Sequence, residues 1–149
     1  MIYLASDHRG MVRKEEVKKI LDEMGEKHTD VGNLAFDPND DAIDFVKEAC
    51  ERMRPPFAEG FGGVKGIFFC GSGVMVDIVA NRFPHIRSCL AVNVDQVKAA
   101  RREDDVNVLC LGADNFGLVD AEKLVRAFLE TTFSNEEKYK QRIEKTKWK

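Results

Sequence analysis

The chain has 149 residues, of which 44% are hydrophobic and 33% are charged, and its formal net charge at pH 7 is −3. This length and balance are typical of one globular domain with a buried core, so we expect residues 1–149 to form a single domain. A slightly acidic chain without a basic stripe argues against nucleic acid as a partner.

The start of the chain lacks the basic and apolar segments of an export signal, and no apolar run approaches the roughly 18 residues of a membrane-spanning helix. We therefore expect a cytoplasmic protein with no membrane partner. The cysteines Cys50, Cys70, Cys89 and Cys110 lie far apart and form no Cys-x-x-Cys pair. That spacing fits neither a zinc site nor a disulfide framework, so we expect reduced thiols, no metal and no cofactor.

Short apolar runs alternate with amphipathic segments along the sequence, which predicts alternating strands and helices. The predicted strands are 2–5, 28–31, 67–70, 86–92 and 107–111. The predicted helices are 11–24, 43–53, 74–81, 94–103 and 118–131, followed by a charged helical tail over 136–149. The two longest connections are a loop over 32–41 and a Pro- and Gly-rich segment over 55–63.

Strands that alternate with helices imply a parallel sheet with right-handed crossovers. We expect an α/β fold of three layers with a doubly wound, five-stranded sheet in the flavodoxin-like (Rossmann-like) order 2-1-3-4-5 and a C-terminal helical tail. In that order the first and third strands are neighbours at the point where the strand order reverses. Ligands of such sheets bind there, outside the carboxyl ends of the strands.

The segment that follows the third predicted strand carries the most informative motif, Cys70-Gly71-Ser72-Gly73. Two glycines around a small hydroxyl residue allow a sharp turn and bring backbone N–H groups close to a bound atom. The next segment reads as the start of a helix, which favours negative charge. The motif therefore suits a site where an anion binds or forms.

The first predicted strand is followed by a polar segment that contains Asp7, His8 and Arg9. The predicted topology places these side chains opposite Cys70 and Ser72. A thiolate there can take a proton from a carbon beside a carbonyl, while the N–H groups of residues 71–73 hold the oxyanion. His8 and Arg9 would bind an anionic part of the substrate.

Simpler interpretations of the same residues remain open. Asp7 would cap the first helix, Cys70 would be a small buried side chain, and His8 would be a surface loop residue. Lys138 and Arg142 would belong to a solvated helix face.

Several motifs together resemble the family of type B ribose-5-phosphate isomerases and galactose-6-phosphate isomerases. They are Ser6-Asp7-His8-Arg9-Gly10, Cys70-Gly71-Ser72-Gly73, Ala80-Asn81-Arg82, Ile86-Arg87, and Asn107-Val108-Leu109 with Gly112. The resemblance runs in order over nearly the whole chain. It implies interconversion of aldose and ketose phosphates through an enediolate without metal or cofactor. It also implies a homodimer or homotetramer whose sites are completed by two subunits, with the tail 134–149 packed on a partner subunit.

The resemblance also implies roles for individual residues. Cys70 would be the base that moves the proton between C1 and C2, and Ser72 would assist it. Gly71 and Gly73 would supply oxyanion donors. Asp7 would bind sugar hydroxyls, and His8 would lie near the phosphate. In the tail, Arg142 matches a phosphate-binding arginine.

The chain departs from the family pattern at several of these positions. Glu103-Asp104-Asp105 stands where the family has His-Asn-Asp, whose histidine is thought to open the sugar ring. We expect Glu103 to act as acid or base in its place, and Asp104 to contact the substrate. Asp114 replaces an arginine, and Lys138 replaces the first tail arginine. Met75 replaces a glycine, and Asp41-Ala42-Ile43 replaces Asp-Tyr-Pro.

Three of these changes add negative charge or remove positive charge near the expected phosphate. They favour a sugar phosphate other than ribose 5-phosphate, or a sugar without phosphate. The first hypothesis is an isomerase with Cys70 as base. The second is a non-catalytic sugar-binding subunit that has lost ring opening. A nucleotide-binding module is disfavoured because the chain lacks a phosphate-length glycine loop and an aromatic stacking pair.

Overall fold

The computed structural model describes residues 1–54 and 63–147, so most of the predicted connection over 55–63 lies outside the described residues. All of the predicted strands and helices are present. The strands are β1 (Ile2–Ser6), β2 (His28–Asp30), β3 (Lys65–Cys70), β4 (Ser88–Leu90) and β5 (Val108–Gly112). The helices are α1 (Met11–Glu23), α2 (Ala42–Arg52), α3 (Val74–Ala80), α4 (Val94–Asp104), α5 (Leu118–Glu130) and α6 (Glu137–Lys145).

The strands form one parallel, five-stranded sheet in the order β2-β1-β3-β5-β4. The predicted fold class is confirmed, but the predicted order of the last two strands is wrong. All residues of β5 are buried, as expected of a strand that is covered on both faces. By contrast, β4 has only three residues and two of them are partly exposed, which suits a short edge strand. Burial therefore places β5 inside the sheet and β4 at its edge.

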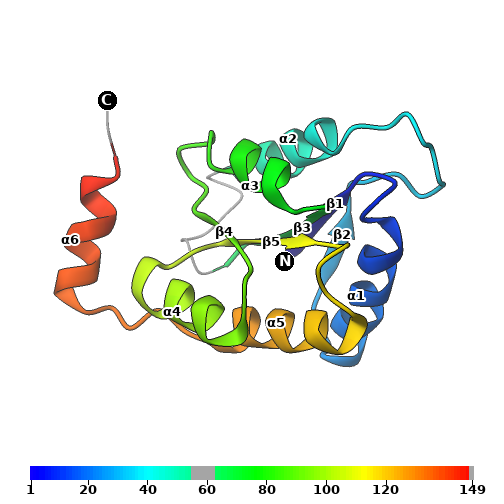
Figure 1. Ribbon diagram of the computed structural model, residues 1–149. Coiled ribbons are helices and arrows are strands. Elements are labelled where there is room, and N and C mark those ends of the chain that lie inside the picture. Colours follow the sequence, from blue (N-terminus) through cyan, green and yellow to red (C-terminus); the bar gives the residue numbers. More distant parts are fainter. Residues whose placement is uncertain (55–62, 148–149) are drawn as a thin grey trace.

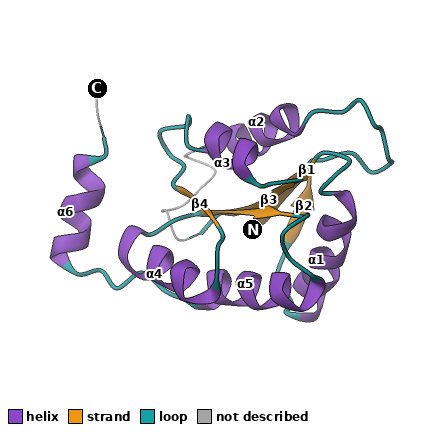
Figure 2. Ribbon diagram, viewed as in Figure 1, coloured by secondary structure: helices purple, strands orange, loops and turns teal. Residues whose placement is uncertain are grey.

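Helices cover both faces of the sheet, as Figures 1 and 2 show. The helices α1, α4 and α5 pack on one face, where their apolar residues meet Leu4, Phe69 and Leu111. The helices α2 and α3 pack on the other face, against Phe68 and Cys110. Successive strand residues alternate between the two apolar cores because side chains in a strand point to opposite faces. The sequences of the central strands β1, β3 and β5, which are apolar at successive positions, thus suit a sheet that is covered by helices on both faces.

Helix α6 stands apart from the three layers, at the left of Figure 1, and its main contact is with α4. Tyr139 is its one buried side chain among the described residues. Most of α6 is exposed to solvent within a single chain, so the helix contributes little to the cores.

Because all strands are parallel, their carboxyl ends lie together on one side of the sheet, called the carboxyl edge here, and their amino ends lie on the opposite side, the amino edge. The loops that follow β1, β2, β3 and β5 gather at the carboxyl edge, opposite α6 in Figure 1. Helix α4 runs back from the end of β4 to the start of β5, so its last turn lies at the amino edge. This difference decides which predicted site residues can meet in one chain.

Candidate functional site

The two predicted site loops are in contact at the carboxyl edge. The pairing of β1 with β3 ends with Ser6 opposite Phe69, so both loops start at the same level of the sheet. A Cβ atom added to Gly10 would lie 2.6 Å from the Cβ of Phe69, and one added to Gly71 would overlap the Arg9 guanidinium. The loops approach this closely because neither position carries a side chain.

Cys70 is the last residue of β3 and is 6% exposed. It packs in the apolar core that contains Phe68 and Cys110, so the simpler reading of a buried side chain fits its packing. Its sulfur also accepts a hydrogen bond from the Gly73 N–H at 3.1 Å, just before α3 begins. A backbone donor at the start of α3 therefore points directly at this sulfur.

The environment of the other cysteines differs. Burial, with a smaller effect from Glu51, raises the pKa of Cys50 to about 12. Burial also raises the pKa of Cys89, and it raises the pKa of Cys110 well above its usual range. These thiols are therefore neutral near pH 7.

The turn after Cys70 is held by the chain that leaves β5. The N–H of Ala113 donates to the Cys70 carbonyl at 2.9 Å, and the N–H of Asp114 donates to the Gly71 carbonyl at 3.0 Å. Gly73 has a φ of +79°, a conformation that side chains disfavour. Ser72 at the tip is exposed, and its Oγ accepts the Val74 N–H at 3.3 Å. Because β5 and not β4 pairs with β3, Asp114 lies beside the turn.

Asp7 and Arg9 each have a partner in this region. One carboxylate oxygen of Asp7 accepts the Gly10 N–H at 3.0 Å, so Asp7 orders the turn before α1. Helix α1 itself has Gly10 as N-cap without a side-chain cap. Arg9 forms an ion pair with Asp114, and both side chains are more than half exposed. Asp114 therefore offsets the charge of Arg9 where the two loops meet.

His8 contacts a residue that the sequence did not single out, Asp40. The backbone N–H of His8 donates to Asp40 Oδ1 at 2.8 Å, and its ring Nδ1 lies 2.7 Å from the same oxygen. The Asn33 side-chain amide donates to the other carboxylate oxygen at 3.0 Å. Burial acts to raise the pKa of Asp40, but the hydrogen bonds from His8 and Asn33 outweigh it and lower that pKa. The one feature of the sequence that points to this contact is the pair of acidic residues at the end of the loop 32–41.

The remaining predicted site residues lie at the opposite edge. Glu103 and Asp104 are the last residues of α4, and Glu103 accepts a hydrogen bond from Arg102 at 3.2 Å. Lys138 and Arg142 lie on α6, with their charged groups 4.5 and 5.4 Å from the centre of the Tyr139 ring. One chain therefore does not bring these residues to Cys70.

A cleft of about 380 Å³ lies between α6 and the body of the molecule, and Asp104 and Arg142 both line it. Burial and the neighbouring Glu103 raise the pKa of Asp104, while Arg142 and Arg87 act in the opposite direction. Arg142 forms no ion pair within residues 1–54 and 63–147, so its charge faces this cleft and solvent.

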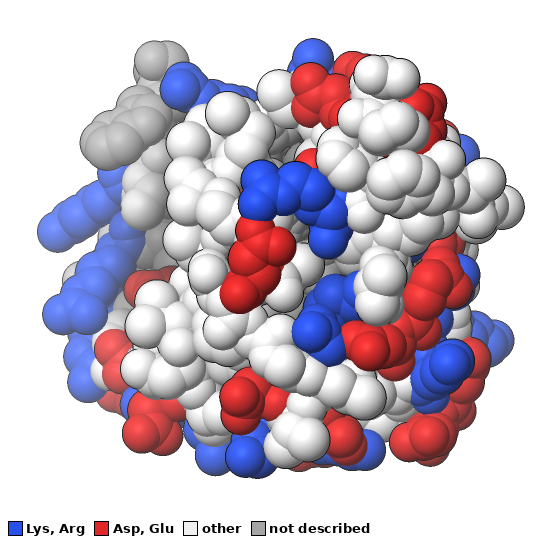
Figure 3. All heavy atoms as spheres, turned by 45° about the vertical axis from the view of Figure 1, so that its right-hand side comes forward, with Lys and Arg blue, Asp and Glu red and all other residues white. Residues whose placement is uncertain are grey.

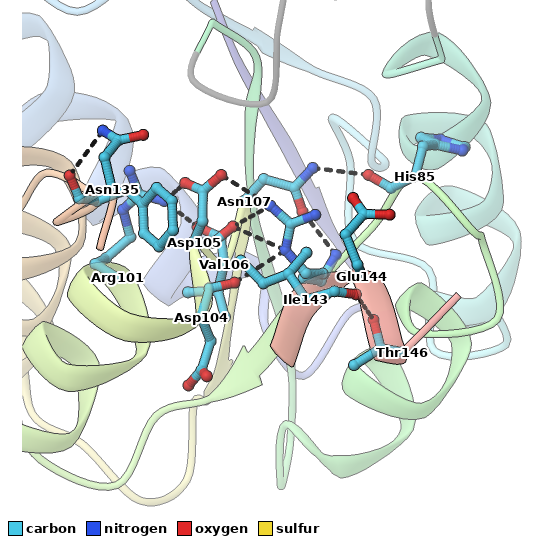
Figure 4. A network of polar contacts seen from close by, with 12 residues as sticks. His85, Arg101, Asp104, Asp105, Val106, Asn107, Asn135, Ile143, Glu144 and Thr146 are labelled. Atoms are coloured by element: carbon cyan, nitrogen blue, oxygen red, sulfur yellow. Dashed lines mark hydrogen bonds and ion pairs between the residues drawn. The ribbon is translucent and has the colours of Figure 1, made fainter. Parts of the chain in front are cut away.

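A polar network holds the end of α4 in place, and Figure 4 shows it beside α6. Asp105 has a φ of +46° and ends the helix. Its carboxylate binds Arg87 at 2.8 Å and Arg101 at 3.1 Å. Asn107 continues the network by donating to the His85 carbonyl at 3.0 Å. The network fixes the direction in which Glu103 and Asp104 leave the helix.

Figure 3 turns the right-hand side of Figure 1 forward. Basic and acidic side chains are interspersed over the centre and right of this face, and basic side chains gather along its left rim. The surface is hollowed beside a central pair of contacting opposite charges. Within the described residues, no helix has the length and apolar character needed to cross a membrane. The same part of the chain contains no group of three or more His, Cys, Asp or Glu placed to hold a metal ion.

Comparisons with known proteins agree with this geometry. A sequence model of the family described as Ribose/Galactose Isomerase matches residues 2–146. A relative from Mycobacterium tuberculosis, named ribose-5-phosphate isomerase B, is 30% identical over 144 residues, which cover 96% of this chain and 85% of the relative.

Solved structures are similar over the same extent. The crystal structure of ribose-5-phosphate isomerase B from Mycoplasma genitalium with bound ribulose-5-phosphate matches with a TM-score of 0.89 and 30% identity, covering 97% of this chain and 92% of that chain. A ribose 5-phosphate isomerase from Thermotoga maritima matches with a TM-score of 0.87 and 31% identity, covering 97% of this chain and 94% of that chain.

Proposed function

The chain belongs to the ribose/galactose isomerase family and is an isomerase of sugar phosphates, and from that premise we propose that Cys70 is the base of a metal-free aldose–ketose isomerisation. The single observation that supports this role most is the Gly73 N–H that donates to the Cys70 sulfur. It places a backbone donor on the Cys70 sulfur beside the two polar loops, while burial raises the pKa values of the other three thiols.

The proposed reaction moves one proton between neighbouring carbons. The Cys70 thiolate takes the proton from C2 of the open-chain aldose, and the C–H electron pair becomes the C1–C2 double bond while the C1 oxygen takes the negative charge. The thiol then returns the proton to C1, and the hydroxyl proton of the C2 oxygen moves to the C1 oxygen. The N–H groups of residues 71 and 72 would hold the anionic oxygen, since the Gly73 N–H donates to the Cys70 sulfur, and the Ser72 hydroxyl at the tip of the turn would assist.

We further propose that a second copy of the chain completes each site. Glu103, Asp104, Lys138 and Arg142 lie at the amino edge, on α4 and on the protruding α6. Cys70 lies at the carboxyl edge, so these groups cannot contact the substrate of the Cys70 in their own chain. In a homodimer, or in a homotetramer built from dimers, these groups would reach the carboxyl edge of the neighbour. Glu103 would then exchange protons with the sugar oxygens, and Lys138 and Arg142 would bind phosphate.

The charged residues of the two loops and of α6 influence which substrate can bind. Arg9 is paired with Asp114 and Lys138 is paired with Glu136, so positive charge for a phosphate would come mainly from Arg142 on α6 of the second copy. His8 and Asp7 would contact sugar oxygens within the same chain. This balance favours a pentose or hexose phosphate whose phosphate reaches α6, and it disfavours tight binding of phosphate next to Arg9.

A non-catalytic sugar-binding role is the second candidate. It is favoured by Glu103, a carboxylate already bound to Arg102 at the position where the family resemblance places the ring-opening histidine. Such a protein would bind sugars without interconverting them.

The test is an isomerisation assay with ribose 5-phosphate, ribulose 5-phosphate, other pentose and hexose phosphates, and the free sugars. We expect turnover of at least one phosphorylated sugar, and we expect Cys70→Ala to reduce kcat by roughly 10²- to 10⁴-fold. Cys89→Ala is the matched control, because Cys89 is a thiol of similar exposure (7% against 6%) away from the two loops. Saturable binding without turnover of any sugar would support the second candidate, and equal activity of the two variants would remove Cys70 from the mechanism.

A further inference from the structure

His8 is held by an unusual arrangement for a loop residue. Asp40, whose side chain is 4% exposed, receives the backbone N–H and the ring of His8 on one carboxylate oxygen. The Asn33 amide occupies the other oxygen. Three donors therefore converge on one buried carboxylate, and two of them come from His8.

This contact determines which ring nitrogen of His8 remains available to a ligand. An ionised carboxylate only accepts hydrogen bonds, so the His8 nitrogen beside it, Nδ1, carries a proton. The other nitrogen, Nε2, forms no hydrogen bond with any residue in the described part of the chain. Nε2 is thus left to accept a proton or hydrogen bond from a ligand, or to donate one when the ring is charged.

The loop that carries Asp40 is itself anchored in the interior. Lys14 is fully buried, and its Nζ donates to Asp30 at 2.8 Å and to the Asn33 carbonyl at 3.0 Å. The ring of Phe36 meets the His8 ring edge-on at 5.8 Å between centroids. A continuous chain of contacts therefore runs from a buried lysine through Asn33 and Asp40 to His8, and the exposed ring of Phe36 lies against the imidazole.

We propose that Asp40 is a positioning residue that fixes the tautomer and orientation of His8, so that His8 Nε2 meets an oxygen atom of the substrate. The proposal rests on the function proposed above, because it takes the crevice beside His8 as the substrate site. The substrate group is a hydroxyl or a phosphate oxygen, since both accept from a charged ring and a hydroxyl also donates to a neutral one.

The first test needs no enzyme activity. Long-range proton–nitrogen NMR correlations of the three histidines report which ring nitrogen is protonated. We expect the neutral His8 ring of the wild type to carry its proton on Nδ1, and we expect Asp40→Asn to weaken that preference, because an amide oxygen is a poorer acceptor than a carboxylate and the amide NH2 group can face Nδ1 in its place. His28 and His85 are internal controls, and Asp37→Asn is the matched variant, because Asp37 is an exposed acid of the same loop that binds the Asn39 N–H. An unchanged His8 pattern in Asp40→Asn would overturn the proposal even if the chain proves inactive.

The second test uses the sugar phosphate that the wild type converts fastest. We expect Asp40→Asn to lower kcat/KM by roughly 10- to 100-fold, with Asp37→Asn near the wild type. In a His8→Ala background, Asp40→Asn should have no further effect, because Asp40 acts through His8. Additive losses would show that Asp40 only supports the fold, and this outcome would overturn the proposal while the proposed function stands. If Asp40→Asn does not fold, Asp40→Glu replaces it in both tests, because it keeps the charge but moves the carboxylate relative to His8.

Discussion

At the scale of single residues, the glycines of the site differ in what they require. Gly71 leaves space for the flexible end of Arg9, whereas Gly73 leaves space for backbone atoms: an added Cβ would lie 2.7 Å from the Gly112 nitrogen and 2.9 Å from the Leu111 carbonyl carbon. Gly73 also has a positive φ, as does Gly25, which has open space around it. A side chain at Gly25 would meet only backbone strain, whereas a side chain at Gly73 would meet both backbone strain and steric overlap, so the two positions allow the two effects to be compared.

We predict that Gly25→Ala lowers the free energy of unfolding by roughly 1–2 kcal/mol, the cost of a left-handed conformation for a residue with Cβ. Gly73→Ala should cost clearly more, because backbone atoms of β5 cannot move aside as a side chain can. Chemical denaturation of both variants measures the difference. Equal losses would mean that the turn after Cys70 can shift away from β5.

The cysteines give a second residue-scale prediction. At pH 8.5 the thiol of Cys50, with a pKa of about 12, remains protonated, and the raised pKa values of Cys89 and Cys110 act in the same direction. Only thiolates react fast with alkylating reagents. We predict that iodoacetamide modifies Cys70 first in the native protein, as peptide mass spectrometry would show. Faster labelling of Cys89 would contradict this view of the sulfur environments.

At the scale of elements, the end of α4 depends on one side chain. Asp105 combines a positive φ with ion pairs to Arg87 and Arg101, and all three side chains are at most 17% exposed. Removing one member of such a group leaves buried charge without its counterpart. The same group sets where Glu103 and Asp104 point, so its loss would disturb the amino-edge residues as well.

We predict that Asp105→Ala lowers the free energy of unfolding by about 3–5 kcal/mol. Asp105→Asn should cost less, because asparagine tolerates a positive φ and still accepts a hydrogen bond. Asp120→Ala, at an exposed acid on α5, is the control and should change stability by no more than about 0.5 kcal/mol. A similar loss in the alanine and asparagine variants would show that charge, and not backbone conformation, dominates at Asp105.

At the scale of the whole molecule, the sequence predicted the layers, the parallel sheet and the meeting of the two loops. Apolar runs and helical spacing are local signals, and the carboxyl ends of parallel strands share one edge. The positions of β4 and β5 were not predictable in the same way, because a crossover can skip a strand without changing any local pattern. The partnership of His8 with Asp40 was also missed, because the loop 32–41 has no periodicity that would orient its side chains.

The separation of the predicted site residues is a property of the whole chain as well. Helix α4 runs antiparallel to the strands, so Glu103 lies across the molecule from Cys70. A site that combines Cys70 with Glu103 would therefore need two copies of the chain. The proposed function itself depends on the claim that Cys70 moves the proton.

The most direct measurement of that claim is deuterium uptake at C2 of the aldose, followed by NMR in deuterated water with wild type and Cys70→Ala. We predict that the wild type exchanges the C2 hydrogen with solvent during isomerisation, and that Cys70→Ala slows this exchange by at least roughly 100-fold while remaining folded. Isomerisation without solvent exchange, or exchange at the wild-type rate in a folded Cys70→Ala variant, would contradict it.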